Sequence, residues 1–459
     1  MRRKFLQSAL VLTLLLVSVA APVVIGGYSE LRAAEKADSY IDIAEHYRRA
    51  AERLPWRSDL FELAGHAYYH AKNYLSADAA YEIASERDSL SAEGWVAWGD
   101  VNYLNGDELR ANEIWEIAFS RGEISDPLYS RLAGMYQRQG EFSKAAQFLQ
   151  QYVSVHVKDG PAHYRLGLLL TLSDSESASS EFIIASQLDP QFDPSTQALR
   201  SALNLAALAP SLSQKYVIIG SGLGLVDEWQ LAHAAFQSAV QVDEKNAEAW
   251  AWLGEANQQL EEDGSVELDR ALELNPNSST VRGLRGLHFQ RAGNYRQALA
   301  EYQTAASIEP NNPARLISIG DVYVYLGDLI RALEAYQTAT TLAPDDVMTW
   351  RALAKFCAQN NVYVKEVGVP AAQRALNLES NSSAEDLLGW LWLLAGSSPD
   401  AERHLLRAIE LDAQNASAYL HLGMLYLQAG DRARAFEPLI HARDLGNSEA
   451  GALLNQFSP

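Results

Sequence analysis

Three arrangements of side chains in this sequence could support chemistry. His66 and His70 lie four residues apart, so a helix would present both imidazoles on one face, where they could share a metal ion. The stretch Tyr216–Gly224 is an apolar run followed by closely spaced glycines, as in turns that hold a dinucleotide. Cys357 is the single cysteine, and a thiol becomes a nucleophile where its pKa is lowered.

Each arrangement also has an ordinary structural explanation. No glutamate follows His66, so the metalloprotease helix motif is absent, and the glycine turn would need a further glycine where Leu225 stands. A lone thiol forms neither an internal disulfide nor a structural zinc site, and we expect Cys357 to be a small buried hydrophobic residue. The sequence therefore predicts no cofactor, no metal and no catalytic residues, with catalysis through His66 and His70 as an alternative.

The charge balance argues against nucleic acid as a partner. Lys and Arg number 37 and Asp and Glu 58, which gives a formal net charge of −21. Such a chain repels phosphate backbones. Because 48% of the residues are hydrophobic, the chain can bury a large core.

The N-terminus predicts a membrane or export segment. Arg2, Arg3 and Lys4 form a basic flank, and the 20 residues Ala9–Tyr28 carry no charge. A run of this length can cross a bilayer as a helix, and the basic start favours a cytoplasmic N-terminus with the body outside. Because the run continues past Ala20, it favours an uncleaved single-pass anchor in a bacterial cell membrane, with residues 5–27 in the lipid.

Two alternatives to the anchor stay open. Ser18-Val19-Ala20 fits the small-x-small site of a cleaved signal peptide, which would export the body without a tether. The segment Arg2–Leu6 also resembles a twin-arginine export motif, although no cofactor-binding fold follows that would need export in a folded state.

The body of the chain repeats itself with a period near 34 residues. One unit has small, aromatic and turn residues at Gly320, Tyr323, Gly327, Ala332, Tyr336, Ala339 and Pro344, and the unit before it matches at Gly286, Phe289, Gly293, Ala298, Tyr302, Ala305 and Pro310. These spacings resemble the tetratricopeptide repeat, a helix–turn–helix unit. We count eleven such units between about Ser58 and Gly446.

The pattern has a physical explanation. A small residue inside the first helix of a unit lets the second helix approach closely, as expected at Gly65, Gly320 and Gly423. Glycine favours the left-handed cap that ends a helix, which predicts first-helix ends at Gly106, Gly140, Gly293, Gly327 and Gly430. Large slots in the repeat core are expected to hold Trp95, Trp115, Trp250, Trp350 and Trp392.

The resemblance implies an all-α fold, a right-handed α-solenoid of about eleven units after one N-terminal transmembrane or signal helix. Two segments break the phase: an extra apolar helix, Thr196–Leu208, and a short terminal helix, Ser448–Phe457, that could cap the open end. The expected organisation is an anchor or signal peptide (1–28), a juxtamembrane helix and partial repeat (29–57), a first repeat array (58–190), the extra helix (191–212), a second array (213–446) and a capping helix (447–459).

In tetratricopeptide repeats the first helices line a groove that holds a partner. Taking the residue after each mid-helix glycine or its equivalent, together with His70, gives the candidate groove contacts His66, His70, Asp100, Glu255, Asp321, Lys355 and Met424. Two binding modes of the family do not fit. There is no Lys/Asn/Arg clamp for a carboxylate, and the asparagine ladder of O-linked N-acetylglucosamine transferases is replaced by Leu63, Ala97, Arg131, Trp252, Leu284, Ser318 and His421.

The resemblance therefore implies a scaffold without enzymatic activity, tethered to the outer face of the cytoplasmic membrane, that binds a protein or peptide in its groove. The alternative is an accessory subunit of an envelope machinery for polysaccharide synthesis, export or secretion, with repeats that contact glycan or the machinery itself.

Overall fold

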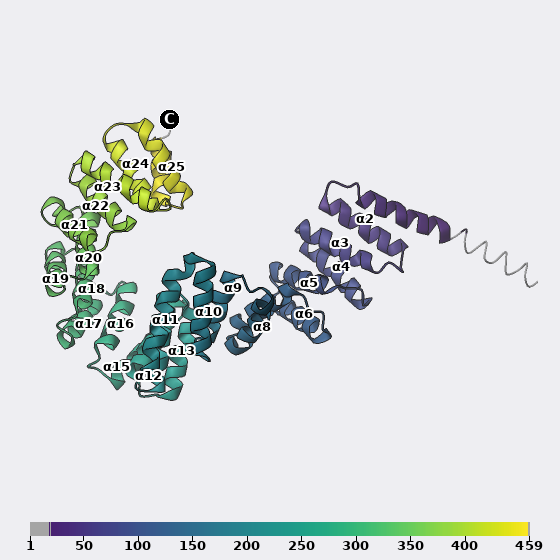
Figure 1. Cartoon of the computed structure of the whole chain (residues 1–459), viewed down its shortest axis with the longest axis horizontal. Coiled ribbons are helices and arrows are strands. Elements are labelled where there is room, and N and C mark those ends of the chain that lie inside the picture. The colour runs from purple at the N-terminus through teal and green to yellow at the C-terminus, as the bar shows by residue number, and fades with distance from the viewer. Residues whose placement is uncertain (1–17, 19, 458–459) are drawn as a thin grey trace, which may run out of the picture. The chain divides into compact units, whose positions relative to one another are not determined.

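The computed structural model describes residue 18 and residues 20–457, and every regular element within them is a helix (Figure 1). The chain divides into two compact units. The first contains the residues up to Ser211 together with Ile218–Ala235, and the second contains Leu212–Val217 together with the residues from Phe236 onward. The division therefore falls within two consecutive helices, α12 (Leu212–Leu225) and α13 (Trp229–Val242).

The first unit opens with a helix over residues 20–34. Its further elements are α2 (Tyr40–Arg53), α3 (Asp59–His70), α4 (Tyr74–Glu86), α5 (Ala92–Leu104), α6 (Glu108–Arg121), α7 (Asp126–Arg138), α8 (Phe142–Val155), α9 (Gly160–Leu170), α10 (Ser175–Leu188), the short 3-10 helix η1 (Pro190–Phe192) and α11 (Asp193–Ala207).

The second unit continues the series after α13. Its elements are α14 (Ala247–Gln259), α15 (Ser265–Leu274), α16 (Ser279–Arg291), α17 (Tyr295–Ile308), α18 (Pro313–Tyr325), α19 (Leu329–Leu342), α20 (Val347–Asn360), the π-helix η2 (Val364–Gly368), α21 (Val369–Leu378), α22 (Ser382–Leu394), α23 (Ser398–Leu411), α24 (Ala416–Gln428), α25 (Arg432–Asp444) and α26 (Ser448–Phe457).

The order of the helices agrees with the expected repeats. From α3 to α25 the described chain supplies eleven consecutive helix pairs, with α11 standing alone between the fourth and the fifth. This single helix covers the predicted extra segment Thr196–Leu208, shifted slightly toward the N-terminus. The predicted terminal helix is α26, which packs against α25.

The first helix differs from the expected organisation, because the boundary placed at residue 28 falls inside it. Gly27 is buried against α2, and a Cβ built on it would lie 2.5 Å from Cγ of Leu54. Glu30 accepts hydrogen bonds from His46 and Arg53 of α2. The expected partial repeat is therefore a full helix pair, which the uncharged run up to Tyr28 concealed because it made the start of this helix resemble the end of an anchor.

Side chains and glycines at the turns fix where the helices begin and end. Ser91 and Asp107 accept hydrogen bonds at 3.0 Å from the backbone N–H of Gly94 and Arg110, which caps the starts of α5 and α6. The glycines predicted to end first helices all have the positive φ of a left-handed cap: Gly106, Gly140, Gly293, Gly327 and Gly430. Short turns of this kind keep the two helices of a pair side by side.

Within each pair, a glycine of the first helix lies against a large side chain of the second. The predicted close approach is confirmed at Gly65, Gly320 and Gly423, and the same contact recurs along both units. The pairs are Gly65–Tyr81, Gly99–Trp115, Gly167–Phe182, Gly286–Tyr302, Gly320–Tyr336, Gly389–Leu405 and Gly423–Leu439. No side chain larger than hydrogen fits at these positions without moving its neighbour.

The tryptophans follow the predicted register only in part. Trp95 and Trp115 are buried as expected. Trp250, Trp350 and Trp392 pack against core residues, as predicted, but their side chains are half-buried rather than fully buried. The indole N–H groups of Trp250 and Trp350 donate to backbone carbonyls of the preceding loops at 2.9 and 2.8 Å, and this polar contact holds the rings near the surface.

The glycine contact gives a direct test of the fold. A Cβ at Gly99 would lie 2.1 Å from Nε1 of the buried Trp115, so Gly99→Ala should lower the free energy of unfolding by about 2 kcal/mol. Gly134 is the matched control, since a Cβ there meets only the ends of two flexible side chains, the guanidinium groups of Arg165 at 3.3 Å and of Arg138 at 3.5 Å. Urea unfolding of both variants, followed by circular dichroism, measures the difference. Equal stability of the two variants would contradict the packing described for Gly99.

Candidate functional site

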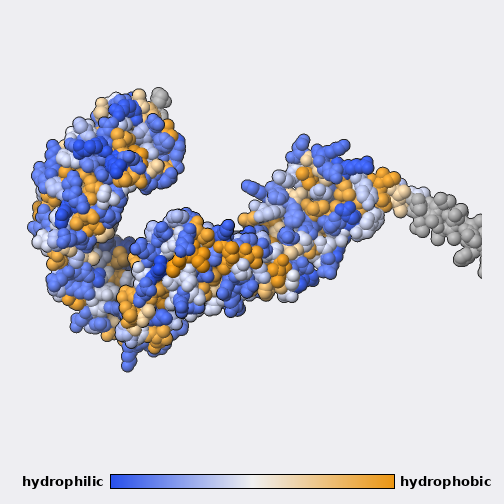
Figure 2. Space-filling view, viewed as in Figure 1, coloured by the Kyte–Doolittle hydropathy of each residue, from blue (hydrophilic) through white to orange (hydrophobic). Residues whose placement is uncertain are grey.

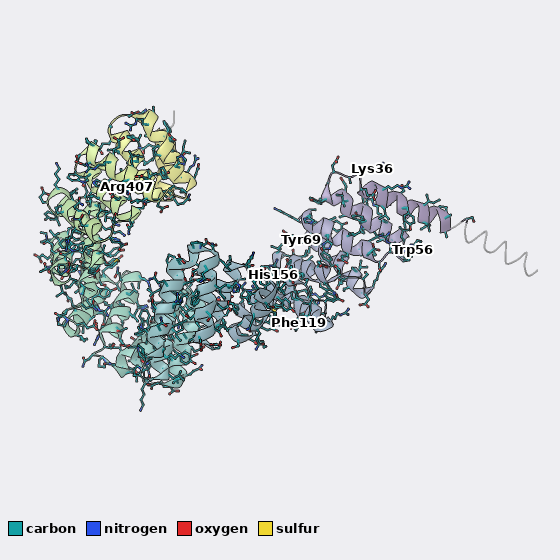
Figure 3. The ribbon with its side chains drawn as sticks, in the orientation of Figure 1. Lys36, Trp56, Tyr69, Phe119, His156 and Arg407 are labelled. Carbon is teal, nitrogen blue, oxygen red and sulfur yellow. The ribbon has the colours of Figure 1, made fainter. Side chains whose placement is uncertain are left out.

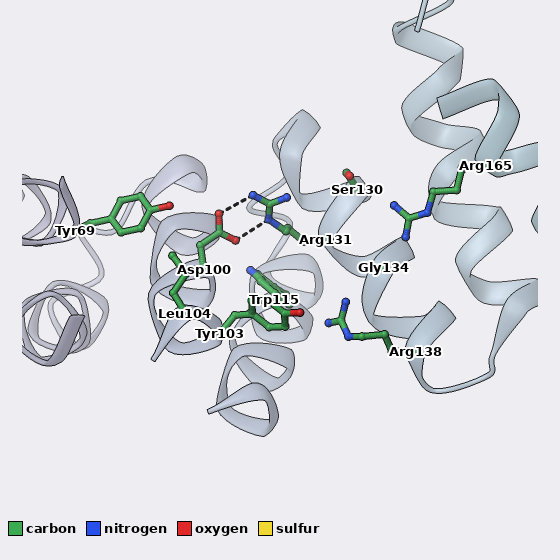
Figure 4. Close-up of a pocket in the computed structure, with 10 residues that line it drawn as sticks. All are labelled: Tyr69, Asp100, Tyr103, Leu104, Trp115, Ser130, Arg131, Gly134, Arg138 and Arg165. Carbon is green, nitrogen blue, oxygen red and sulfur yellow. Dashed lines mark hydrogen bonds and ion pairs between the residues drawn. The ribbon is translucent and has the colours of Figure 1, made fainter. Parts of the chain in front are cut away.

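A cavity of about 370 Å³ opens between the first helices of four successive pairs in the first unit (Figure 4). We call it the first-helix cavity. The helices α3, α5, α7 and α9 supply most of its lining, and α6 adds one side chain. Its residues are Tyr69, Asp100, Tyr103, Leu104, Trp115, Ser130, Arg131, Gly134, Arg138 and Arg165.

Asp100 and Arg131 form a two-pronged ion pair on one side of this cavity. Nε and Nη2 of Arg131 donate to the two carboxylate oxygens of Asp100 at 2.7 and 2.8 Å. The hydrogen bond and charge of Asp100 raise the pKa of the Arg131 guanidinium. Asp100, a predicted groove contact, therefore lies at the expected face, but its carboxylate is already paired with Arg131 of the next repeat.

Arg138 and Arg165 lie on the other side and point toward one another across Gly134 (Figure 4). Nε of Arg138 donates to Glu108 at 2.5 Å. Nε of Arg165 donates at 3.0 Å to the side-chain oxygen of Gln137, which is neutral. Within the described residues Arg165 makes no ion pair, and burial together with the charge of Arg138 lowers the pKa of its guanidinium.

Apolar and aromatic side chains complete the first-helix cavity. Trp115, which is 2% exposed, lies beneath it, while Tyr103 and Leu104 remain accessible at its edge. The guanidinium of Arg138 stacks over the Tyr103 ring, 5.0 Å from its centroid. The cavity can therefore receive a ligand that carries both a negative group and an apolar side chain.

A smaller cavity of about 260 Å³ lies between α18, α19 and α20 of the second unit. It brings together two predicted groove contacts, Asp321 and Lys355. Asp321 accepts a hydrogen bond from the hydroxyl of Tyr336, and among the described side chains no cation pairs with it. Burial raises the pKa of the Asp321 carboxyl, against the smaller opposite effect of the Tyr336 hydrogen bond.

The other predicted groove contacts are engaged within the fold to different degrees. Glu255 is 3% exposed and accepts hydrogen bonds at 2.7 and 2.8 Å from Arg291. Met424 is half-buried and packs with the apolar core of the last pairs. Charge or apolar character at this register therefore does not by itself make a residue available to a partner.

His66 and His70 do not converge on a common site. Nδ1 of His66 is hydrogen-bonded to the Tyr81 hydroxyl at 2.8 Å, whereas His70 stacks on Tyr40 with ring centroids 5.1 Å apart. In the part of the chain that the structure describes, no group of three or more His, Cys, Asp or Glu side chains could hold a metal ion.

The remaining chemical candidates are structural. Residues Tyr216–Gly224 lie within the helix α12, so the strand that a dinucleotide-binding turn requires is absent from this described segment. Cys357 is buried in α20, and burial raises the pKa of its thiol to about 11. A thiol of that pKa is protonated near neutrality, which agrees with the prediction of a small hydrophobic residue.

Arg138 and Arg165 were missed as site residues. Arg165 stands two residues before Gly167, in the same register as Arg131, and this spacing could have identified it. Arg138 lies one helical turn after Gly134, beyond the positions taken to face the groove. The sequence cannot show which of these arginines has a carboxylate partner, since those partners come from other repeats.

Comparisons with known families agree with the repeat assignment. Two family models, each described as a tetratricopeptide repeat, match residues 315–346 and 387–444. The chain therefore contains tetratricopeptide repeats, as the spacing of its glycines, alanines and aromatic residues predicted.

Several known proteins resemble the chain at low identity. Subunit 3 of the anaphase-promoting complex of Schizosaccharomyces pombe is 25% identical over 36% of this chain, and superkiller complex protein 3 of Mus musculus is 22% identical over 60%. The matches span 25% and 17% of those proteins. Among solved structures, yeast Tom70 has a TM-score of 0.42 and the Cut9–Hcn1 assembly 0.46, each at 15% identity. Tom70 is matched over 96% of this chain and 95% of its own, and Cut9–Hcn1 over 98% of both.

The buried Asp321 carboxyl gives a pH-dependent prediction. Because its pKa is raised on folding, the stability that the protonated form contributes is present at low pH and is lost as pH rises through the folded-state pKa. Asp321→Asn keeps an acceptor for Tyr336 without the charge, so it should raise the free energy of unfolding at pH 7 by about 1 kcal/mol. This gain should shrink as pH falls toward the ordinary carboxyl pKa.

Urea unfolding of the wild type and the variant, at pH 7 and at a pH close to the ordinary carboxyl pKa, measures the effect. Asp328→Asn is a suitable control, because Asp328 caps α19 at the surface and an asparagine caps equally well. A stabilisation by Asp321→Asn that is the same at both pH values would show that the charge of Asp321 is not its cause.

Proposed function

We propose that the chain is a non-enzymatic scaffold that binds a segment of another protein along the face formed by its first helices. The observation that carries this proposal is the first-helix cavity, to which four successive repeats contribute. Its aromatic edge and charged walls suit a polypeptide, which offers apolar and polar side chains in alternation. The second unit has a smaller cavity, between α18, α19 and α20, that contains Asp321 and Lys355.

The comparisons support a binding role rather than catalysis. Tetratricopeptide repeats are generally scaffolds, and the two related proteins are named as a subunit or protein of a multiprotein complex. Four consecutive repeats line the first-helix cavity, so a ligand bound there would lie against several repeats at once.

We also propose that the scaffold is tethered to the outer face of the cytoplasmic membrane through residues 5–27. Most of that segment lies outside the described residues, and none of the helices within them is both long and apolar enough to cross a bilayer. The support comes from the uncharged run in the sequence and from the helix over residues 20–34, which contains the end of that run. Val23 and Ile25 of this helix are 48% and 69% accessible. Figure 2 shows hydrophobic surface where the described chain begins.

A tryptophan at the same end of the first helix pair fits this tether. Trp56 follows α2 and is 57% exposed. Figure 3 shows Trp56 and Lys36 at opposite ends of the first helix pair, with Trp56 at the end where the ribbon begins. The proximity of Gly26 to Arg53 at the end of α2 agrees with this placement. Tryptophan prefers the headgroup region of a bilayer, so Trp56 suits a position beside the membrane surface.

Site-specific crosslinking tests the binding face. A photoreactive phenylalanine analogue at Tyr103 lies at the edge of the first-helix cavity, so it should give discrete adducts in membranes that contain the partner. The same analogue at Leu75, which is 72% exposed at the start of the second helix α4, is the matched control. Adducts are measured by gel electrophoresis and mass spectrometry.

The comparison between the two positions decides the proposal. Adducts that form equally at Leu75 and Tyr103 would mean that contact does not depend on the first-helix face. Absence of adducts at Tyr103, with adducts at Leu75, would place the partner on the second helices and overturn the proposed binding face.

Extraction of membranes at high pH tests the tether. The full-length chain should stay with the lipid, and its intact mass should include residues 5–27. Leu15→Arg places a charge inside the uncharged run, at about 3 kcal/mol in a bilayer centre, and should release the chain. Leu75→Arg, on the exposed surface of α4, should not. A mature mass that begins after Ala20 would establish cleavage and export instead.

A further inference from the structure

The first-helix cavity has an excess of positive charge in a strongly negative chain. Three guanidinium groups, of Arg131, Arg138 and Arg165, line it, whereas the chain as a whole carries a net charge of −21. Asp100 neutralises Arg131 through two hydrogen bonds, and Glu108 neutralises Arg138 through one. Arg165 is left as a half-buried cation whose hydrogen-bond partner is the neutral amide of Gln137.

The geometry places Arg138 and Arg165 so that one ligand can reach both. A Cβ built on Gly134 would lie 3.3 Å from Nη2 of Arg165 and 3.5 Å from Nη1 of Arg138. Both guanidinium groups therefore converge over the same backbone position, and the missing side chain of Gly134 leaves the space between them open (Figure 4). Each guanidinium retains N–H groups beyond the Nε already in use, and a carboxylate has two oxygens to accept them.

We propose that the first-helix cavity binds the carboxylate of an acidic side chain of the partner protein, held between the guanidinium groups of Arg138 and Arg165. This inference rests on the proposed function, since it specifies the chemistry of a partner bound at the same face. An apolar side chain next to the acidic one packs on Tyr103 and Leu104 at the edge of the cavity. A polyanion such as a nucleic acid is disfavoured, because the chain as a whole carries a net charge of −21.

The environment of Arg165 favours an anion between the two guanidinium groups. Removal of the Arg165 guanidinium from water destabilises the folded chain, the neighbouring charge of Arg138 adds to this effect, and the charge of Glu228 has only a smaller opposite effect. A bound carboxylate would relieve both contributions. Arg131 is less suited to this role, because its Nε and Nη2 already donate to Asp100 and its charge is neutralised by that carboxylate.

Titration of the full-length protein, labelled with ¹⁵N at arginine, tests the inference. The probe is glutamate blocked as N-acetyl and α-amide, so that its side-chain carboxylate is its single charge. Its uncharged match is the same derivative of glutamine. We expect the glutamate probe to shift the Nε–Hε signals of Arg138 and Arg165 with a dissociation constant on the order of 1 mM, and the glutamine probe to leave them unchanged.

Three variants assign the effect to Arg165. Arg165→Gln should weaken binding of the glutamate probe about tenfold, because the charged hydrogen bonds are lost. Arg165→Lys should weaken it about threefold, since an ammonium supplies the charge without the fork. Arg121→Gln is the control, because Arg121 pairs with Asp88 at the surface outside the cavity. Circular dichroism should show no loss of thermal stability in Arg165→Gln, since an unpaired buried charge has been removed.

Several outcomes would overturn the inference. Equal shifts with the glutamine probe, or unchanged affinity in Arg165→Gln, would show that the carboxylate is not recognised there. Tighter binding of inorganic phosphate than of the glutamate probe would make the cavity a phosphate site. If Tyr103 crosslinks to a partner while Arg165 shows no preference for carboxylate, the inference fails and the proposed function stands. If the glutamate probe binds but Tyr103 gives no adducts, the proposed binding of a protein fails instead.

Discussion

The contact between a first-helix glycine and a large second-helix side chain is the constraint on which both units depend. At Gly99 and Trp115, as at Gly320 and Tyr336, the helices approach so closely that a methyl group would not fit. This contact fixes the rotation of the first helix about its axis. The residues just after the glycine are thereby turned toward the face formed by the first helices, and the same rotation recurs from pair to pair. The first-helix face is therefore a consequence of packing before it is a binding surface.

Most of the charge on that face joins one repeat to the next. Asp100 pairs with Arg131 across 31 residues and Glu255 with Arg291 across 36, which is close to the repeat period in each case. Asp386 and His421 are hydrogen-bonded across 35 residues in the last pairs. Such pairs fill the face with charges that neutralise one another. A charged residue becomes notable there when its neighbour one repeat away offers no opposite charge, which is the situation of Arg165.

The sequence was sufficient for the fold and insufficient for the site, and the reason is physical. Gly106, Gly327 and Gly430 mark helix ends because left-handed caps depend on local backbone freedom, which one residue type reveals. The register of Asp321 and Lys355 was also readable, and they do share a cavity. The burial of Glu255 under Arg291 could not be predicted from the sequence, since Arg291 lies 36 residues away and its rotamer depends on tertiary packing. For the same reason residues 20–28 looked like the end of an apolar anchor, although Gly27 packs this part of the first helix against Leu54.

The acidity of the chain and the positive cavity act over different distances. The net charge of −21 is distributed over an exposed surface, where salt screens it within about 10 Å at ordinary ionic strength. Arg138 and Arg165 lie in a partly enclosed site where a direct contact is screened much less. Long-range repulsion therefore opposes ligands that carry many negative charges, whereas a short-range contact favours one well-placed carboxylate. Selectivity for a single acidic side chain within an otherwise neutral or basic segment follows from this combination. The two arginines and the open space at Gly134 are sufficient for it.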